Sequence, residues 1–287
     1  MAVTIEQLQA IRAETARFSY SDRESFLYAL SVGFGRDPLN LDELPYVCEN
    51  EHVIRTVPTM ATVLTQFSAL RESGIDYSKV LHAEQRLKVF RPLPAAATIV
   101  ADYGVTAVVD KGPEKGALIF VETRVRNADD GQPLYTAGAT IMARGDGGIG
   151  SVGDAPGALP SPPARAPDQV VSFQTLPGQA LLYRLNGDRN PLHSNPAMAL
   201  RGGFSQPILH GLCTYGVACK TIIASICGYD HARIEQFDVR FTSPVYPGEQ
   251  LDIEIWNEGT SVMFRCRAPA RDVIALNNGV CTFRTFA

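Results

Sequence analysis

The two halves of this 287-residue chain read as degenerate copies of one unit, and this repeat constrains the possible folds more than any other feature. The segments Leu27-Tyr-Ala-Leu30 and Arg36-Asp-Pro-Leu-Asn40 correspond in order to Leu182-Tyr-Arg-Leu185 and Arg189-Asn-Pro-Leu-His193, with glycines between them in both halves. Later in each half, Phe90-Arg-Pro-Leu-Pro94 corresponds to Ser243-Pro-Val-Tyr-Pro247. The chain is therefore expected to contain two similar folding units.

Hydrophobic periodicity and turn residues predict the same order of elements in both halves, namely helix, loop, long helix and antiparallel meander. For the first half the pattern predicts a short helix or arm at 4–16, a helix from 18 to 30 with a Ser21/Glu24 capping box and a Gly33/Gly35 stop, a helix at 58–72, and strands at 52–57, 80–89, 98–109, 117–125 and 134–143. For the second half it predicts helices at 179–185 and 210–228 and strands at 237–241, 251–256, 262–268 and 279–286.

A stretch from Arg144 to Pro167 is rich in Gly, Pro, Ala and Ser, which is the composition of a linker. We therefore predict an N-terminal unit at 1–145, a linker at 146–168 and a C-terminal unit at 169–287. One long hydrophobic helix with four or five antiparallel strands per unit indicates an α+β fold with two similar halves.

The segment Tyr183–His193 places a carboxylate, an amide and an imidazole within six residues of one another, at Asp188, Asn190 and His193. Gly187 and Pro191 favour a tight, rigid loop that presents these polar groups, although the same residue types also build ordinary turns. At average residue usage, a chance match to this spacing in such a chain is on the order of one in ten thousand.

This loop resembles the signature of the type 2, (R)-specific enoyl-CoA hydratases, the MaoC-like group that includes the hydratase part of peroxisomal multifunctional enzymes. The resemblance covers nearly the whole chain and implies a double hot dog, in which two sheets each wrap a central helix. In that family the N-terminal hot dog accommodates the acyl chain. Here the first copy has Asn40 where the second has His193, and Gly35 near the position of Asp188, so one active site per chain is expected.

The resemblance also implies roles for individual residues. Asp188 and His193 correspond to the catalytic pair, Asn190 to a group that orients the water or the carbonyl, and Gly211, at the start of the long helix, to the oxyanion hole. Positions that match substrate contacts are His82, Ala83, Lys111, Arg189, Pro191, Leu192 and Phe241; Ala83 stands where the family usually has glycine. Arg184 and Arg201 are further candidates for the CoA phosphates. His210 is expected to line the site or to cap the helix.

The implied reaction is the reversible hydration of (2E)-enoyl-CoA to (3R)-3-hydroxyacyl-CoA in β-oxidation of fatty acids or of a sterol side chain. The expected partner is the acyl-CoA, no cofactor is expected beyond the CoA of the substrate, and the family suggests a homodimer. Two other enzymes on the same fold are alternatives, a 3-hydroxyacyl-carrier-protein dehydratase and an acyl-CoA thioesterase. A non-catalytic acyl-CoA-binding module is the alternative from another class.

Charge and composition narrow the remaining possibilities. A net charge of −4 provides no overall attraction to nucleic acid or to an anionic membrane. The N-terminal residues lack the apolar core of a signal peptide, no apolar run reaches membrane-spanning length and the last residues are not a Ser-Lys-Leu address, so a cytoplasmic protein is expected. Six cysteines without a Cys-X-X-Cys pair are expected to be reduced thiols. No metal is expected, because a site built on His193 and His210 would lack a third ligand at readable spacing.

Overall fold

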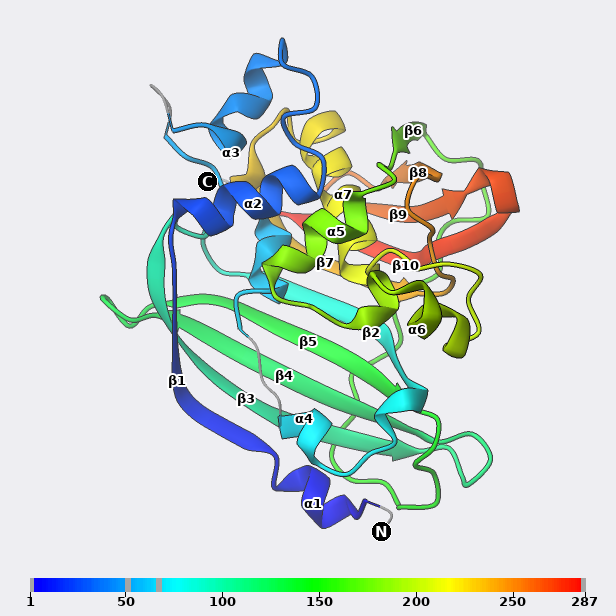
Figure 1. The fold of residues 1–287 in the computed structure, drawn as a ribbon. Helices are drawn as coiled ribbons and strands as arrows, with labels where there is room; N and C mark the ends of the chain where they lie inside the picture. The colour runs from blue at the N-terminus through cyan, green and yellow to red at the C-terminus, as the bar shows by residue number, and fades with distance from the viewer. Residues whose placement is uncertain (1–2, 50–52, 66–68, 285–287) are drawn as a thin grey trace.

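The computed structural model describes residues 3–49, 53–65 and 69–284, and its central element is one antiparallel ten-stranded sheet (Figure 1). The strands follow one another across the sheet in the order β1-β3-β4-β5-β2-β7-β10-β9-β8-β6. Counted inward from the two edges of the sheet, the strands of the two halves occupy matching positions. The matching pairs are β1 and β6, β3 and β8, β4 and β9, β5 and β10, and β2 and β7. This order confirms the predicted repeat.

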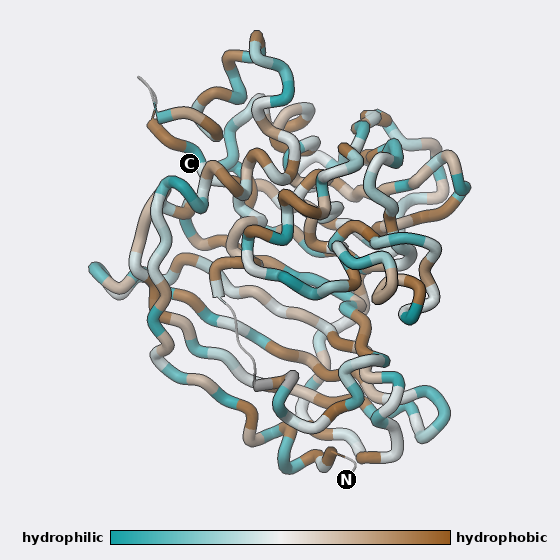
Figure 2. The backbone as a smooth tube through the Cα atoms, in the orientation of Figure 1, coloured by the Kyte–Doolittle hydropathy of each residue, from teal (hydrophilic) through white to brown (hydrophobic). Residues whose placement is uncertain are grey.

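The strands agree closely with the sequence pattern in most places. In the first half they are β1 (Arg12–Tyr20), β2 (Val80–Val89), β3 (Ala97–Asp110), β4 (Ala117–Asn127) and β5 (Pro133–Ala143). In the second half they are β6 (Gln169–Gln174), β7 (Ile234–Phe241), β8 (Gln250–Asn257), β9 (Ser261–Ala268) and β10 (Val273–Phe283). Figure 2 shows hydrophilic stretches gathered in the outer loops and turns, with hydrophobic segments running along the strands and helices.

The central helix is α7 (Gly211–Ser225), and ten of its fifteen residues are buried. It is apolar on almost every side, so it can exist in water only when strands and helices surround it. Strands β7 and β10 contact it, as does the 3₁₀-helix η2 (Pro58–Thr62) from the first half. Both halves of the chain therefore bury the helix whose first residue is Gly211.

Shorter helices cover the sheet and carry the connecting loops. The α-helices are α1 (Ile5–Gln9), α2 (Asp22–Ser31), α3 (Leu44–Val47), α4 (Ala69–Glu72), α5 (Gln179–Tyr183) and α6 (Pro196–Arg201). The 3₁₀-helices besides η2 are η1 (Leu41–Glu43), η3 (Tyr77–Lys79), η4 (Arg184–Asn186), η5 (Pro191–His193), η6 (His231–Arg233) and η7 (Pro269–Arg271). The predicted capping box is present, because Glu24 accepts a hydrogen bond of 2.8 Å from the Ser21 amide.

The prediction of a continuous helix at 58–72 is wrong. The structure has η2, a turn that ends the helical geometry after Thr62, and the separate short helix α4, while 66–68 lie outside the described residues. The Thr62 hydroxyl donates to the Thr59 carbonyl at 2.8 Å, a local bond that competes with continued α-helix. Among the described residues, the first half therefore has no helix as long as α7.

Four other elements differ from the prediction. The segment expected as an arm at 4–16 is α1 followed by β1, an edge strand whose many exposed side chains hide its strand character. Residues 53–57 form no strand, and His52 lies outside the described residues. The last strand begins at Val273, not at Gly279, because a shift in the β10–β7 register between Asn277 and Val280 interrupts the alternation; Phe286 also lies outside the described residues. Strand β6 was not predicted.

The two halves join through the pairing of β2 with β7. Within this ladder the buried Asp238 carboxylate accepts a hydrogen bond of 3.1 Å from the Leu87 amide, so a side chain takes the place of a backbone acceptor. The segment between the halves is held against the first half, since the Gly148 and Gly150 amides donate to Asp110 at 2.9 and 2.8 Å. The division at 1–145, 146–168 and 169–287 remains our proposal.

All six cysteines are free, and five of them are buried. Within the described ranges, no helix combines the length and the apolar character needed to cross a membrane.

The close contact between α2 and α7 supplies the first testable prediction. A Cβ atom at Gly216 would lie 2.5 Å from Val32 Cγ1 and 2.9 Å from Tyr28 Oη. Gly216→Ala should therefore lower the free energy of unfolding by about 1–3 kcal/mol, because the packed helices cannot accept a methyl group without moving. Thermal unfolding followed by circular dichroism measures this. Gly157→Ala is the control, since its Cβ would meet nothing within 4 Å; equal melting temperatures for the two variants would contradict the packing argument.

Candidate active site

The loop between α5 and α6 is held rigid by its own backbone contacts. Gly187 has a φ of 121°, a conformation that glycine adopts without strain. The Asp188 carboxylate accepts from the Asn190 amide at 3.0 Å, and the Asn190 side-chain oxygen caps η5 by accepting from the Leu192 amide at 3.1 Å. These bonds bring the acid and the imidazole of the loop to the same side of a single turn.

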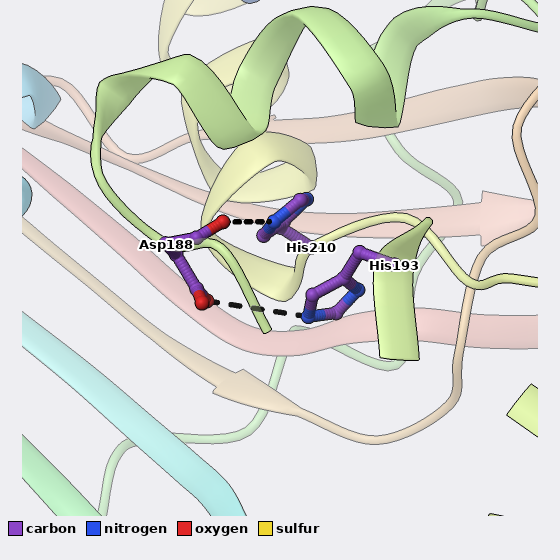
Figure 3. Close-up of side chains that lie close together, drawn as sticks. All are labelled: Asp188, His193 and His210. Carbon is purple, nitrogen blue, oxygen red and sulfur yellow. Dashed lines mark hydrogen bonds and ion pairs between the residues drawn. The ribbon is translucent and has the colours of Figure 1, made fainter. Parts of the chain in front are cut away.

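Asp188 and His193 face each other with 4.0 Å between the carboxylate Oδ2 and the imidazole Nε2 (Figure 3). The other ring nitrogen, Nδ1, lies 2.9 Å from the carbonyl oxygen of Ile208. A carbonyl can only accept, so Nδ1 carries a hydrogen and donates it, which leaves the lone pair of the neutral ring on Nε2. His193 is buried whereas half of the Asp188 side chain is exposed, so the pair lies at the boundary between protein and solvent.

A second imidazole completes the cluster. The His210 ring stacks on the His193 ring, with centroids 3.7 Å apart and planes inclined by 25°, and its Nε2 donates to the main-chain oxygen of Asp188 at 3.1 Å (Figure 3). His210 precedes α7 as its N-cap residue, but its side chain makes no capping hydrogen bond. Of the two roles expected for His210, the structure therefore supports lining the site.

Burial keeps both imidazoles neutral at neutral pH. It lowers the pKa of His193 below the ordinary value, although the Ile208 carbonyl and the Asp188 carboxylate oppose this effect. Burial, followed by the proximity of His193, lowers the pKa of His210 to about 4. Two stacked imidazolium ions would repel each other, so both rings stay neutral. Each neutral ring keeps one nitrogen lone pair that can accept a proton.

Residues from both halves lie near the pair. The His82 ring of β2 lies 4.8 Å from the Phe241 ring of β7. Burial lowers the pKa of His82 to about 4, although the nearby Asp188 carboxylate opposes this effect. Phe241 packs on Gly211, where a Cβ would lie 3.0 Å from the ring. The β2–β5 register shifts between His82 and Glu84, which leaves Ala83 as an extra residue without a register partner on β5. His82 thus lies near the Asp188 carboxylate, and Phe241 lies between His82 and Gly211, the residue that follows His210; the substrate contacts expected of His82, Ala83 and Phe241 stay a prediction.

The predicted cations are more scattered. Arg189 is exposed beside Asp188, together with Pro191, while Leu192 is half-buried. Arg184 is close enough to His210 to influence its pKa, and the exposed Arg201 lies at the end of α6. Lys111 is exposed in the turn after β3, and in the sheet β4 and β5 separate β3 from β2. No contact within the described residues places Lys111 against the Asp188–His193 pair.

No metal was expected, because His193 and His210 were thought to lack a third ligand, and this premise is wrong. The described residues include a third donor, because ligand atoms of Asp188, His193 and His210 all lie within 4.8 Å of one another. Chemistry still disfavours a shared ion. Ring nitrogens bind metals in the plane of the ring at about 2.0–2.1 Å, and two rings stacked nearly parallel cannot direct their lone pairs to one point. Both rings also already donate to backbone carbonyls.

The corresponding loop of the first half has a different role, because it bonds to the segment that follows α7. Asn40, in the place of His193, donates a hydrogen bond of 3.0 Å to the Tyr229 hydroxyl. The backbone oxygen of Tyr229 accepts from Tyr46 and from Arg55 at 2.7 and 2.8 Å. This loop therefore secures the segment after α7 and carries no acid–imidazole pair.

The stacked position of His210 and the Ile208 carbonyl that sets the His193 tautomer were not predicted from the sequence. The only available signal was a histidine directly before the glycine that opens an apolar helix. Backbone acceptors leave no trace in a sequence, so Ile208 could not have been found.

Comparison with known proteins adds independent findings. Residues 159–278 match the model of the MaoC-like domain, and residues 18–145 match the MFE-2 hydratase 2 N-terminal domain. The Mycobacterium tuberculosis protein named enoyl-CoA hydratase ChsH3 is 38% identical over 98% of both chains. The Arabidopsis thaliana protein named enoyl-CoA hydratase 2, peroxisomal, is 36% identical over 94% of this chain and 92% of its own.

Solved structures agree on the fold. A MaoC-like dehydratase from Phytophthora capsici superposes with a TM-score of 0.86 at 29% identity, over 99% of this chain and 100% of its own. A Mycobacterium tuberculosis protein described as having a double hotdog fold superposes with a TM-score of 0.58 at 16% identity, over 96% of both chains.

The geometry of the cluster predicts how its rings titrate. The Asp188 carboxylate raises the pKa of His82, His193 and His210, so Asp188→Asn should lower all three, because a negative charge that favours the protonated rings is removed. NMR titration of ring resonances in ¹⁵N-histidine-labelled protein measures the shifts. His231 is the internal control, since its low pKa of about 4 comes from burial, with influences from Asp230 and Arg55 and not from Asp188. Unchanged values at His193 and His210 would contradict the arrangement.

Proposed function

Because the chain belongs to the MaoC-like family of type 2 enoyl-CoA hydratases, we propose that its Asp188 and His193 side chains add water reversibly to (2E)-enoyl-CoA and form (3R)-3-hydroxyacyl-CoA. The protein is then a hydro-lyase of a β-oxidation type pathway. The observation that carries the residue assignment is the 4.0 Å separation of the Asp188 carboxylate and the His193 Nε2. A single water molecule fits between two acceptors at this distance, with each hydrogen directed at one of them.

The reaction needs a base for water, an acid for C2 and a donor for the thioester oxygen. As the water oxygen bonds to C3, the pair takes one proton from it, and the electrons of the double bond move onto the thioester oxygen. The enolate-like state then collapses as the pair returns one proton to C2 on the same face. Such positioned groups typically contribute about 10² to 10⁴ each in rate. In this proposal Asn190 orients the water or the carbonyl.

Gly211 is proposed as the donor to the developing negative charge. Its amide is one of the first in α7, which have no partner within the helix and lie at the positive end of the helix dipole. The lack of a side chain at Gly211 leaves room for the thioester beside Phe241. Loss of one such donor typically costs about 10² to 10³ in rate.

The acyl chain is proposed to extend over the sheet of the first half. A cavity of about 180 Å³ lies where a long helix was expected, between the broken helical segment and strands β2 to β5. Ala61, Thr62 and Thr65 line it on one side, and Gln85 and Gly138 are among the strand residues on the other. Gln85 follows the irregularity at Ala83 on β2, so the cavity begins a few residues from His82.

The alternatives differ in what they require of the site. A thioesterase would release thiol from saturated acyl-CoA, and a carrier-protein dehydratase would turn over CoA substrates poorly. A non-catalytic acyl-CoA-binding module would not need both Asp188 and His193, so their proximity favours an enzyme. The proposal includes no cofactor beyond the CoA of the substrate, a homodimer, and a cytoplasmic location. A peroxisomal location is the alternative, since one relative is named peroxisomal.

Substitution of the pair tests the catalytic assignment. Asp188→Asn and His193→Ala should each lower kcat/KM for hydration of an enoyl-CoA by about 10²- to 10⁴-fold, because each removes a proton-transfer group. Loss of enoyl thioester absorbance measures the rate, and circular dichroism checks the fold. Asn40→Ala is the matched control, since Asn40 occupies the place of His193 in the first half. Near wild-type hydration by either of the first two variants would refute the assignment.

A truncated substrate tests the role proposed for Lys111 in binding CoA phosphates. Lys111→Ala should raise KM for an enoyl-CoA by about three- to tenfold with kcat unchanged, because it removes one exposed charge–charge contact. For the corresponding N-acetylcysteamine thioester, which has no phosphates, KM should not change. Glu114→Gln, in the same exposed turn, is the control. Equal effects on both substrates would exclude a phosphate contact.

A further inference from the structure

The His210 side chain is more constrained than a buried histidine needs to be. Only 2% of the residue is exposed, one ring face covers the His193 ring at 3.7 Å, and the Tyr183 ring lies 5.0 Å away. Its Nε2 donates to the main chain of Asp188. One histidine thus contacts both members of the Asp188–His193 pair, one through its backbone and the other through its ring.

We propose that His210 is the positioning residue of the active site, which clamps the Asp188 backbone by a hydrogen bond and sets the plane of the His193 imidazole by stacking. The inference rests on the proposed function of the Asp188–His193 pair and goes beyond it, because His210 itself contacts neither water nor thioester in this assignment. It acts only through the two residues that do.

The clamp has a direct geometric consequence. The Asp188 side chain is half exposed, and no ion pair to Lys or Arg holds it within the described residues. Its carboxylate accepts from the Asn190 amide of the same turn, and the hydrogen bond from His210 to its main-chain oxygen ties that turn to the start of α7. A loss of that bond would let the carboxylate move away from Nε2 of His193. Misplacement of a reacting group by about 1 Å can cost a large factor in rate.

The stack has a separate consequence. The His193 ring is held at one point by its bond to Ile208, which still permits the ring to tilt. A flat ring at 3.7 Å prevents that tilt and excludes water from one face of the imidazole. The lone pair on Nε2 then stays directed toward the Asp188 carboxylate.

His210 also carries a cost that a purely structural residue would avoid. Within the part of the chain that the structure describes, its Nδ1 is buried without a hydrogen-bond partner. An unsatisfied buried acceptor destabilises the fold, and an apolar ring of similar size would remove that penalty. A phenylalanine would fill the space but could not donate to Asp188. The Nε2 hydrogen bond to Asp188 is thus what an imidazole provides at this position and an apolar ring would not.

Three substitutions separate the clamp from the stack. His210→Gln places an amide nitrogen near the position of Nε2 and keeps the donor without a ring. His210→Asn has the same chemistry but is too short to reach the Asp188 carbonyl. His210→Phe keeps the ring without the donor. We expect kcat for enoyl-CoA hydration to fall about tenfold in the Asn and Phe variants, the factor for one lost hydrogen bond, with KM within about twofold. The Gln variant should recover most of this loss.

The acid side of the pH profile reports the stack. Groups that face His210 are His193, Asp188, Arg184 and Tyr183, and only the ring of His193 is covered by the stack. Loss of the ring in His210→Gln admits water to His193, so the pKa of His193 should rise toward its ordinary value and the acid limb of kcat/KM should move to higher pH. In His210→Phe the limb should stay near its wild-type position. NMR titration of His193 gives the same readout without turnover.

Each outcome decides the inference. The control is His231→Gln, because His231 is a half-buried histidine that contacts Tyr46 instead; this variant should keep wild-type kcat and pH profile. Equal kcat in the Gln and Asn variants would overturn the clamp, and an unmoved His193 titration in the Gln variant would overturn the stack. If His210→Phe does not fold, the Gln and Asn pair still decides the clamp. A wild-type protein without hydratase activity would refute the proposed function instead, whereas the NMR result would still stand.

Discussion

The burial of α7 is the constraint on which the rest of the molecule depends. Its sequence is apolar on nearly every side, so it needs a sheet and helices from both halves to remove it from water. Its first turn nevertheless has amide groups that no intrahelical bond can satisfy. The loop that carries Asp188 and His193 contacts this end of the helix through His210, and Phe241 packs directly on Gly211.

The same burial shapes the chemistry of the histidines. Imidazoles at the edge of the core remain neutral because charging them would cost hydration energy, and the carboxylate of Asp188 only partly offsets this cost. Backbone carbonyls then define which nitrogen of each ring carries a hydrogen. Main-chain geometry thus places a neutral imidazole acceptor next to a carboxylate.

The repeat explains why the two halves are not equivalent. Each half has a short helix, α2 or α5, followed by a loop and later by a meander of strands. The strands of the two halves occupy mirrored positions about the β2–β7 junction. In the first half the loop bonds to Tyr229, and the helix that would match α7 is broken after Thr62. The space left over its sheet is the cavity proposed for the acyl chain. The loop of the second half therefore carries an acid–imidazole pair, and the loop of the first half does not.

The sequence alone determined the repeat, most strands, the apolar helix and the loop from Gly187 to His193, because these depend on local periodicity and turn chemistry. It also singled out Asp188 and His193, whose side chains the structure places 4.0 Å apart. The pattern of hydrophobic residues was misleading for the edge strand β1, which forms by pairing with β3, and for the helix at 58–72, where the Thr62 hydroxyl bonds to the backbone. Only the tertiary structure decided that His210 stacks on His193 and that His82 lies beside Phe241, because these contacts join residues from different elements. No local pattern records how such elements pack, and their packing is set by the shared need to bury one helix.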